Sequence, residues 1–123
     1  MAEYEAVAKQ FVEHYYNTFD SNRSALAPLY RDESMLTFQS AQVGGGPAIA
    51  EKLASLPFQK VKHQINSFES QPTPGGAGII ILVAGALLVD EEQNPLNYAQ
   101  TFQLVKDPAG AWFLFNDIFS LLV

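Results

Sequence analysis

Few side chains in this sequence combine the residue type and the spacing that chemistry needs. The two histidines, His14 and His63, have no neighbouring ligands at metal-binding spacing, and the absence of cysteine excludes thiol catalysis, disulfides and cysteine-ligated metals. The glycine-rich segment GGGP at 44–47 lacks the Lys-Ser/Thr ending of a phosphate-binding loop. We find no Ser-His-Asp order and no pair of catalytic carboxylates. The sequence therefore predicts no catalytic residue, no metal and no cofactor.

The densest charge is an acidic triplet, Asp90, Glu91 and Glu92, which directly follows the apolar run Ile79–Val89. Every charged residue between Lys62 and Lys106 is an acid, so nothing nearby in sequence neutralises the triplet. A run of like charges is ordinarily a solvated turn. Beside an apolar pocket, the same run would attract a basic partner. The residues alone leave both interpretations open.

His63 is the one titratable residue on an apolar strand face, because it alternates with Val61 and Ile65 in the predicted strand 60–66. A lone inward histidine is most often a hydrogen-bonded structural residue. A histidine in a cleft is also a candidate for function. Both roles stay open for His63.

The elements that position these residues follow from hydrophobic periodicity. Apolar residues at helical spacing predict a first helix over 4–19, and Leu26, Leu29 and Tyr30 predict a shorter second one. Pro47 suits the first position of a third helix over about 47–56. Strands are predicted at 34–38, 60–66, 79–89, 96–106 and 111–121, with turns at 71–78 and 106–110. Helices first and antiparallel strands last are typical of an α+β fold.

Length and composition narrow the class of protein. A chain of 123 residues fits a single domain, 1–123, and its net charge of −6 disfavours a nucleic-acid partner. The run Ile79–Val89 is too short for a membrane-spanning helix, and the first residues do not resemble a signal peptide. We therefore expect no membrane partner and a location in the cytoplasm or nucleus.

Two of the predicted strands, 79–89 and 111–121, are apolar on both faces. The helices suffice to cover one face of a sheet, and a bare second face would exceed the apolar patch that monomers tolerate. Pairing of two copies, sheet against sheet, is the simplest remedy. We expect a homodimer with Leu82, Ala84, Phe115 and Ile118 in its interface. Covering loops over a bulky core are the alternative.

Six segments, in this order, resemble the nuclear transport factor 2 family in its fungal form. They are FVEHYYNTFDSNRSALAPLY, SMLTF, EKLASLPFQKVKHQI, QPTP, LLVDEEQNP and FNDIF, and the similarity extends over about residues 4–121. The resemblance implies a cone-like α+β fold: three N-terminal helices packed on a strongly curved, mostly antiparallel sheet around an apolar cavity. It also implies a non-enzymatic homodimer that carries the GDP-bound form of the GTPase Ran into the nucleus. Such carriers cross the nuclear pore by contacting FxFG repeats of nucleoporins.

The resemblance also implies site residues. The cavity mouth would receive an aromatic side chain of Ran, with rim acids pairing with flanking basic residues. The matching Ran-binding positions are Phe38, Gln39, His63, Asp90, Glu91 and Glu92. Gln39 departs from the pattern, since the family usually has a glutamate there; loss of a charge-assisted pair would lower Ran affinity about tenfold or more. Phe38 replaces the family's usual tryptophan.

For nucleoporin binding, the resemblance points to Tyr4 and Asp20. Core packing at the start of the first helix is the alternative role of Tyr4. Three functions remain open: a dimeric carrier of Ran-GDP, a relative that has lost Ran binding through Gln39, and a small-molecule binder or isomerase-like enzyme using His63 and a rim acid. Related cone folds include isomerases and dehydratases, so the fold alone does not decide among them.

Overall fold

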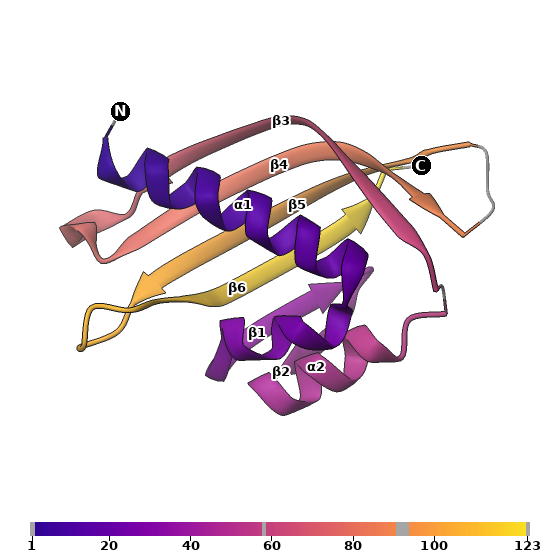
Figure 1. Cartoon of the computed structure of the whole chain (residues 1–123). Coiled ribbons are helices and arrows are strands. Elements are labelled where there is room, and N and C mark those ends of the chain that lie inside the picture. Colours follow the sequence, from indigo (N-terminus) through magenta and orange to yellow (C-terminus); the bar gives the residue numbers. More distant parts are fainter. Residues whose placement is uncertain (1, 58, 91–93, 123) are drawn as a thin grey trace.

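The computed structural model describes residues 2–57, 59–90 and 94–122. Two α-helices, two short 3₁₀ segments and six strands follow one another along the chain (Figure 1). In order they are α1 Glu3–Ser21, η1 Arg23–Leu29, β1 Tyr30–Phe38, β2 Ala41–Gly44, α2 Gly46–Ala54, β3 Val61–Pro72, η2 Pro74–Gly76, β4 Gly78–Val89, β5 Leu96–Lys106 and β6 Trp112–Leu121.

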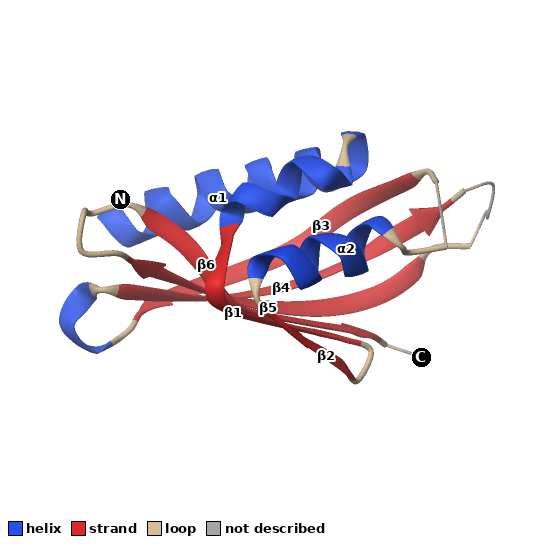
Figure 2. Ribbon diagram, turned by 90° about the horizontal axis from the view of Figure 1, so that it is seen from below, coloured by secondary structure: helices blue, strands red, loops and turns tan. Residues whose placement is uncertain are grey.

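The six strands form one sheet in the order β2-β1-β6-β5-β4-β3. Neighbouring strands are antiparallel except β1 and β6, which are parallel. Both α-helices lie on the same side of the sheet, and within the described residues the other side carries no α-helix (Figure 2). The predicted fold is confirmed: three helical segments pack on a curved, mostly antiparallel sheet.

Helix α1 packs along the concave face through one stripe of side chains. Ala8, Val12, Tyr15 and Phe19 are buried at helical spacing, as periodicity predicts. They meet the inward side chains of the sheet, where β5 contributes Tyr98, Phe102 and Leu104. Burial of this stripe fixes α1 over the open side of the cone.

Sheet curvature depends on an irregular pairing between β3 and β4. The register shifts between Ile65 and Ser67, which marks a β-bulge. Opposite this point lies Gly85, where an added Cβ would overlap the carbonyl oxygen of Gln64. Glycine therefore permits the two strands to approach where they bend.

Several elements differ from those predicted. The second helix is the 3₁₀ segment η1, and Tyr30 begins β1 because Pro28 prevents a regular helix from continuing. Strand β2 was not predicted, since its four residues are mostly exposed and carry no alternating pattern. Strand β3 continues beyond residue 66 to Pro72, past the bulge that ends its simple alternation.

No helix in the described part of the chain is long and apolar enough to cross a membrane.

Candidate functional site

An apolar hollow of about 560 Å³ opens beside the ends of the strands. Its walls are the ends of four strands, β1, β4, β5 and β6, and the segment before β5: Phe38, Leu87, Val89, Asn94, Leu96, Phe119 and Leu121. A volume in this range with an almost wholly apolar lining suits a bulky hydrophobic group. Phe38 borders the hollow, as the sequence predicts.

The floor of the hollow is a stack of aromatic rings. Phe38 and Phe119 lie nearly parallel with centroids 4.7 Å apart, and Phe119 stacks on Tyr98 at 5.5 Å. The pairing of β1 with β6 places Phe38 directly beside Phe119. The Nζ of Lys52, on α2, lies 6.0 Å from the centroid of the Phe38 ring. An incoming aromatic side chain would extend a stack that is already formed.

Asp90 lies next to the hollow, immediately after Val89, but its carboxylate is engaged with the chain itself. Its Oδ1 accepts hydrogen bonds from the backbone N–H groups of Gln59 and Lys60, each at 2.9 Å. These bonds hold the pKa of Asp90 below its usual range. Its φ of 52° is one that aspartate and asparagine tolerate better than most residues. Glu91 and Glu92 lie outside the described residues.

Gln39 also borders the mouth, since it follows Phe38 and contacts the end of β6. Its Oε1 accepts a hydrogen bond from the backbone N–H of Leu121 at 2.7 Å. One of the two acceptor positions of this oxygen is therefore used within the chain.

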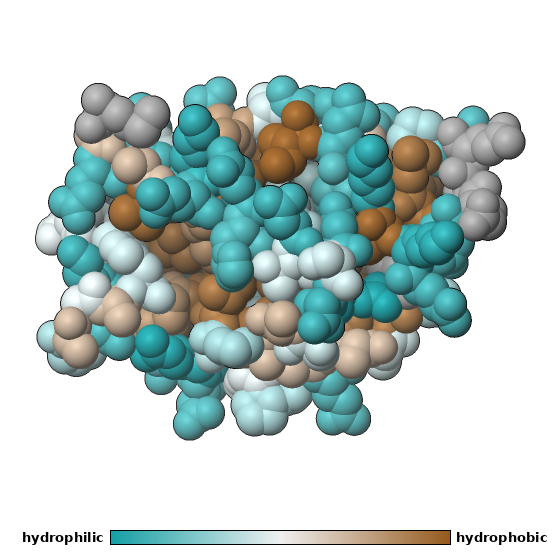
Figure 3. Space-filling view, viewed as in Figure 1, coloured by the Kyte–Doolittle hydropathy of each residue, from teal (hydrophilic) through white to brown (hydrophobic). Residues whose placement is uncertain are grey.

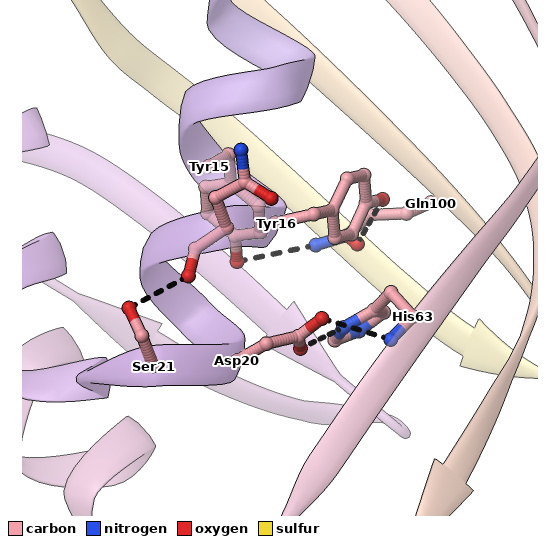
Figure 4. Close-up of polar contacts among 7 residues, drawn as sticks. Tyr15, Tyr16, Asp20, Ser21, His63 and Gln100 are labelled. Carbon is pink, nitrogen blue, oxygen red and sulfur yellow. Dashed lines mark hydrogen bonds and ion pairs between the residues drawn. The ribbon is translucent and has the colours of Figure 1, made fainter.

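His63 is paired with Asp20, and this pair joins the end of α1 to β3 (Figure 4). The ring Nδ1 lies 2.6 Å from one carboxylate oxygen of Asp20, and the backbone N–H of His63 donates to the other at 2.9 Å. The His63 side chain is only 3% exposed and contacts the rings of Tyr16 and Phe19. This geometry fits the structural role left open by the sequence.

A second, narrower space among the core side chains has a volume of only about 10 Å³ for the centre of a water-sized molecule. His63 lines this inner space together with Tyr15, Leu53 and Gln100, and it does not line the large hollow. A volume this small holds about one water molecule and no larger ligand.

A buried polar cluster centred on Asp117 of β6 closes the inner end of the cone. Tyr15 and Tyr30 donate to its Oδ2 at 3.2 and 2.8 Å, and the Nε2 of Gln100 donates to its Oδ1 at 2.7 Å. Tyr16 donates in turn to Gln100 Oε1 at 2.7 Å. Burial raises the pKa of Asp117 to about 6, although the three hydrogen bonds oppose that shift. The cluster ties α1, β1, β5 and β6 together.

The two expected nucleoporin-binding residues lie at opposite ends of α1. Tyr4 is partly buried against the core near the start of the helix, and Asp20 lies in its last turn. At 1.5 Å per residue they are about 24 Å apart, so one chain does not bring them into a single contact site.

The four expected interface residues lie on two neighbouring parts of the outer sheet face. Leu82 and Ile118 are 49% and 48% exposed, and both pair with Thr101 of β5. Ala84 is half-buried one step further along β4. Phe115 is half-buried at the point where the pairing of β5 with β6 shifts, between Leu104 opposite Leu114 and Gln103 opposite Asn116.

Met35 and Ile80 extend this outer patch, with 48% and 47% of their surfaces exposed. By contrast, the side that carries α1 is mostly hydrophilic, with hydrophobic side chains visible only in separate hollows beside the helix (Figure 3). The apolar side chains at the outward-facing positions of these strands are therefore exposed in a single chain.

Sequence reasoning missed Asp117, Gln100 and the contacts of Gln39. An aspartate inside the apolar run of 111–121 is the signal that could have indicated a buried polar cluster. Among the described residues, no group of three or more His, Cys, Asp or Glu side chains could hold a metal ion.

A curved sheet covered by helices around an apolar hollow defines a cone-fold protein of the nuclear transport factor 2-like class. The family model described as "Nuclear transport factor 2 (NTF2) domain" matches residues 7–121. Proteins named nuclear transport factor 2 from Neurospora crassa and Emericella nidulans are 60% and 57% identical to this chain. The first alignment covers 98% of this chain and 97% of the relative, and the second covers 99% and 98%.

The solved structure of nuclear transport factor 2 from Cryptosporidium parvum has a TM-score of 0.90 and 40% identity, and covers 98% of this chain and 95% of that one. The chain belongs to the nuclear transport factor 2 family, and the resemblance seen in its sequence is confirmed.

Proposed function

We propose that this protein is a nuclear transport factor that binds Ran in its GDP-bound form and carries it from the cytoplasm into the nucleus. The observation that carries the proposal is the 560 Å³ apolar hollow lined by Phe38, Phe119 and Val89, the residue that directly precedes Asp90. A buried aromatic anchor supplies most of the affinity of such an interface, and nearby charges set orientation and encounter rate. The GDP form is preferred because switch regions of a GTPase move when the γ-phosphate is present.

An enzymatic function has less support from the geometry. His63 is bound to Asp20 and faces an inner space of about 10 Å³, so the acid–base pair and the large hollow do not coincide. The proposal is therefore a non-enzymatic carrier.

A second candidate is a family member with weakened Ran binding, and Gln39 is the observation that favours it. The side chain at 39 carries no charge, and its oxygen is bound to Leu121. Such a protein would keep dimerisation and nucleoporin binding.

We propose that the outer sheet face pairs with a second copy of the chain. Met35, Ile80, Leu82 and Ile118 are each about half exposed on β1, β4 and β6 of the one sheet, and an uncovered patch of this kind marks an interaction surface. A two-fold axis through the sheet would bury the patch of each chain against the other. Two copies would also present Tyr4 twice to the FxFG repeats of nucleoporins, which raises avidity.

The test of the carrier function is capture of purified Ran, loaded with GDP or GTP, on the immobilised protein. We expect capture of the GDP form alone. The variant Leu96→Lys places a cation inside the hollow and should abolish capture, since Leu96 lines the hollow and is exposed enough to be replaced without unfolding. Leu122→Lys is the matched control, because Leu122 is similarly exposed and does not line the hollow. Equal capture by both variants would contradict a Ran site at the mouth.

The same assay separates the two candidates. A protein that captures neither form of Ran, but captures Ran-GDP once Gln39→Glu is made, would be the weakened relative. Its retention on FxFG-repeat resin would show that the second function remains.

A further inference from the structure

Sulfur is rare in this protein. The sequence holds no cysteine and two methionines, Met1 and Met35, so Met35 is the only sulfur-bearing side chain in the described part of the chain. Among the side chains of a protein without thiols, the thioether of methionine is the one that peroxides oxidise readily. Met35 can therefore undergo a reaction that its aliphatic neighbours cannot.

Met35 is uncovered on the outer face of β1. It is 48% exposed, whereas Ser34 and Leu36 on either side of it are buried. Its partner on β2 is Gly44, which has no side chain to cover it, and a Cβ added at Gly44 would meet no heavy atom within 4 Å. On the other side, β6 places Asn116 beside Met35. In a single chain, this side chain is therefore open to a small oxidant.

The same side chain belongs to the outer patch that we assign to pairing of two copies. Strands β1 and β6 pair Met35 with Asn116 and Thr37 with Ile118, so Ile118 is the diagonal neighbour of Met35 on the outer face. The other exposed members of the patch are the hydrocarbon side chains Ile80, Leu82 and Ile118. Met35 is thus the member of the patch whose polarity a chemical reaction can change.

We propose that Met35 is a redox-sensitive site, at which hydrogen peroxide converts the thioether to the sulfoxide and thereby weakens the pairing of two outer faces. The sulfur attacks one peroxide oxygen, so that an S–O bond forms while the O–O bond breaks. The leaving hydroxide takes the proton of the transferred oxygen and departs as water. Sulfur loses two electrons, and the peroxide gains them. The inference rests on the proposed pairing and adds a means of regulating it.

The sulfoxide opposes pairing because its oxygen is a strong hydrogen-bond acceptor. Water binds this oxygen in a single chain, and entry into a patch of Ile and Leu side chains removes that water. In a two-fold pair each chain contributes one Met35, so the loss counts twice. We expect the oxidised pair to dissociate at least tenfold more readily. A dithiol-dependent reductase reverses the change, since the sulfoxide oxygen leaves as water while the dithiol becomes a disulfide.

Sedimentation equilibrium before and after treatment with hydrogen peroxide tests the effect, with mass spectrometry to locate the sulfoxide. The dissociation constant of the wild-type pair should rise at least tenfold and return after incubation with methionine sulfoxide reductase. Met35→Leu is the matched control, because leucine has a similar volume, cannot be oxidised and leaves Met1 in place; its dissociation constant should not respond to peroxide. Met35→Gln places a polar side chain of similar length there and should weaken pairing without peroxide.

Pairing should in turn protect Met35 from the oxidant. With peroxide in excess, the rate constant for oxidation of Met35 should fall as the wild-type concentration is raised above the dissociation constant. Ile118→Lys, which should dissociate the pair, keeps Met35 exposed and should be oxidised at the same rate at both concentrations. Equal rates for the wild-type protein would overturn the placement of Met35 in the paired surface.

A wild-type pair whose dissociation constant is unchanged after Met35 has become the sulfoxide would overturn the redox site. A Met35 that peroxide does not oxidise in Ile118→Lys would overturn it as well. If the untreated wild-type protein is monomeric, the proposed pairing fails, and the redox site fails with it. Sedimentation before peroxide decides the pairing and sedimentation after peroxide decides the redox site, so the two failures are distinguishable.

Discussion

Asp117 and Ile118 are neighbours on β6, yet they lie on opposite faces of the sheet and reverse the usual distribution of side chains. The charged residue is fully buried under α1, and the apolar one is 48% exposed on the outer face. Buried charges and exposed apolar patches are the informative exceptions to hydrophobic burial. On the inner face, three donors within the chain stabilise the buried carboxylate of Asp117. On the outer face, no described helix or loop covers the apolar side chain of Ile118.

The two faces of the sheet therefore differ in whether their exceptional side chains have partners within the described part of the chain. The inner cluster has its partners, because Tyr15, Tyr30 and Gln100 all donate to Asp117. On the outer face, Leu82 and Ile118 are about half exposed, and both described α-helices lie on the other side of the sheet, which supports the proposed pairing with a second molecule (Figure 2). Changes to the inner face should therefore alter folding, and changes to the outer face should alter assembly.

The largest effect is expected from Asp117→Leu. This change removes the charged acceptor that three buried donors share and should lower the free energy of unfolding by about 3–5 kcal/mol. Urea denaturation followed by circular dichroism measures it. Asp117→Asn keeps one acceptor and should cost less; a stable Asp117→Leu protein would contradict the stabilising role of the cluster.

A pH titration sharpens the same point. The pKa of Asp117 is about 6 in the folded state and near 3.8 when unfolded, so the folded protein binds the proton more tightly. Both states are protonated below about pH 3, and as the pH rises the unfolded state loses its proton before the folded state does. The free energy of unfolding should therefore fall by about 3 kcal/mol between about pH 3 and pH 7 on account of this group, and change little above about pH 7.

Other carboxyl groups titrate in the same range, so the comparison is made against Asp117→Asn. The free energy of unfolding of the wild type minus that of this variant should fall by the stated amount as the pH rises from about 3 to about 7. A constant difference would mean that Asp117 has no raised pKa.

On the outer face, Ile118→Lys should act on assembly rather than on folding. Two lysines facing each other across a two-fold interface should weaken dimerisation about 100-fold, which is about 2.7 kcal/mol. Sedimentation equilibrium measures the dissociation constant. Asn17→Lys, on the exposed side of α1, is the control for added charge. A wild-type protein that is monomeric at micromolar concentration would contradict the proposed dimer through the outer face.

The smallest effect is expected at the rim, from Asp90→Asn. Asparagine keeps the acceptor for Gln59 and Lys60 and tolerates the positive φ, so the loop should stay folded while the charge is lost. Ran-GDP affinity should fall about tenfold, with a weaker dependence on salt. Asp90→Lys is a less specific test because it also breaks both backbone bonds. Calorimetric titration at two ionic strengths measures the change, and an unaltered salt dependence would argue against a charge contact.

Much of the fold could be predicted from the sequence, because α1 and β4 to β6 have long, clear periodic patterns. Strand β2 and the parallel pairing of β1 with β6 could not, since a four-residue exposed strand has no pattern and pairing partners lie far apart in the chain. The apolar exposure of Leu82 and Ile118 followed from strands with two apolar faces.

The site was less predictable than the fold. Phe38 lines the hollow and Asp90 follows Val89, which also lines it, but nothing in the sequence indicates that Asp90 binds the backbone of Gln59 and Lys60. The bond from Leu121 to Gln39 joins residues 82 positions apart, which local patterns do not reveal. Side-chain bonds to distant backbone groups depend on the finished fold.

A methyl NMR titration of the labelled protein with Ran-GDP tests most directly whether the hollow is the Ran site. The methyl signals of Leu87, Val89 and Leu121 in the hollow should shift or broaden. Those of Ile80, Leu82 and Ile118 on the outer face should not. Shifts confined to the outer face, with the hollow unaffected, would contradict a Ran site in the hollow.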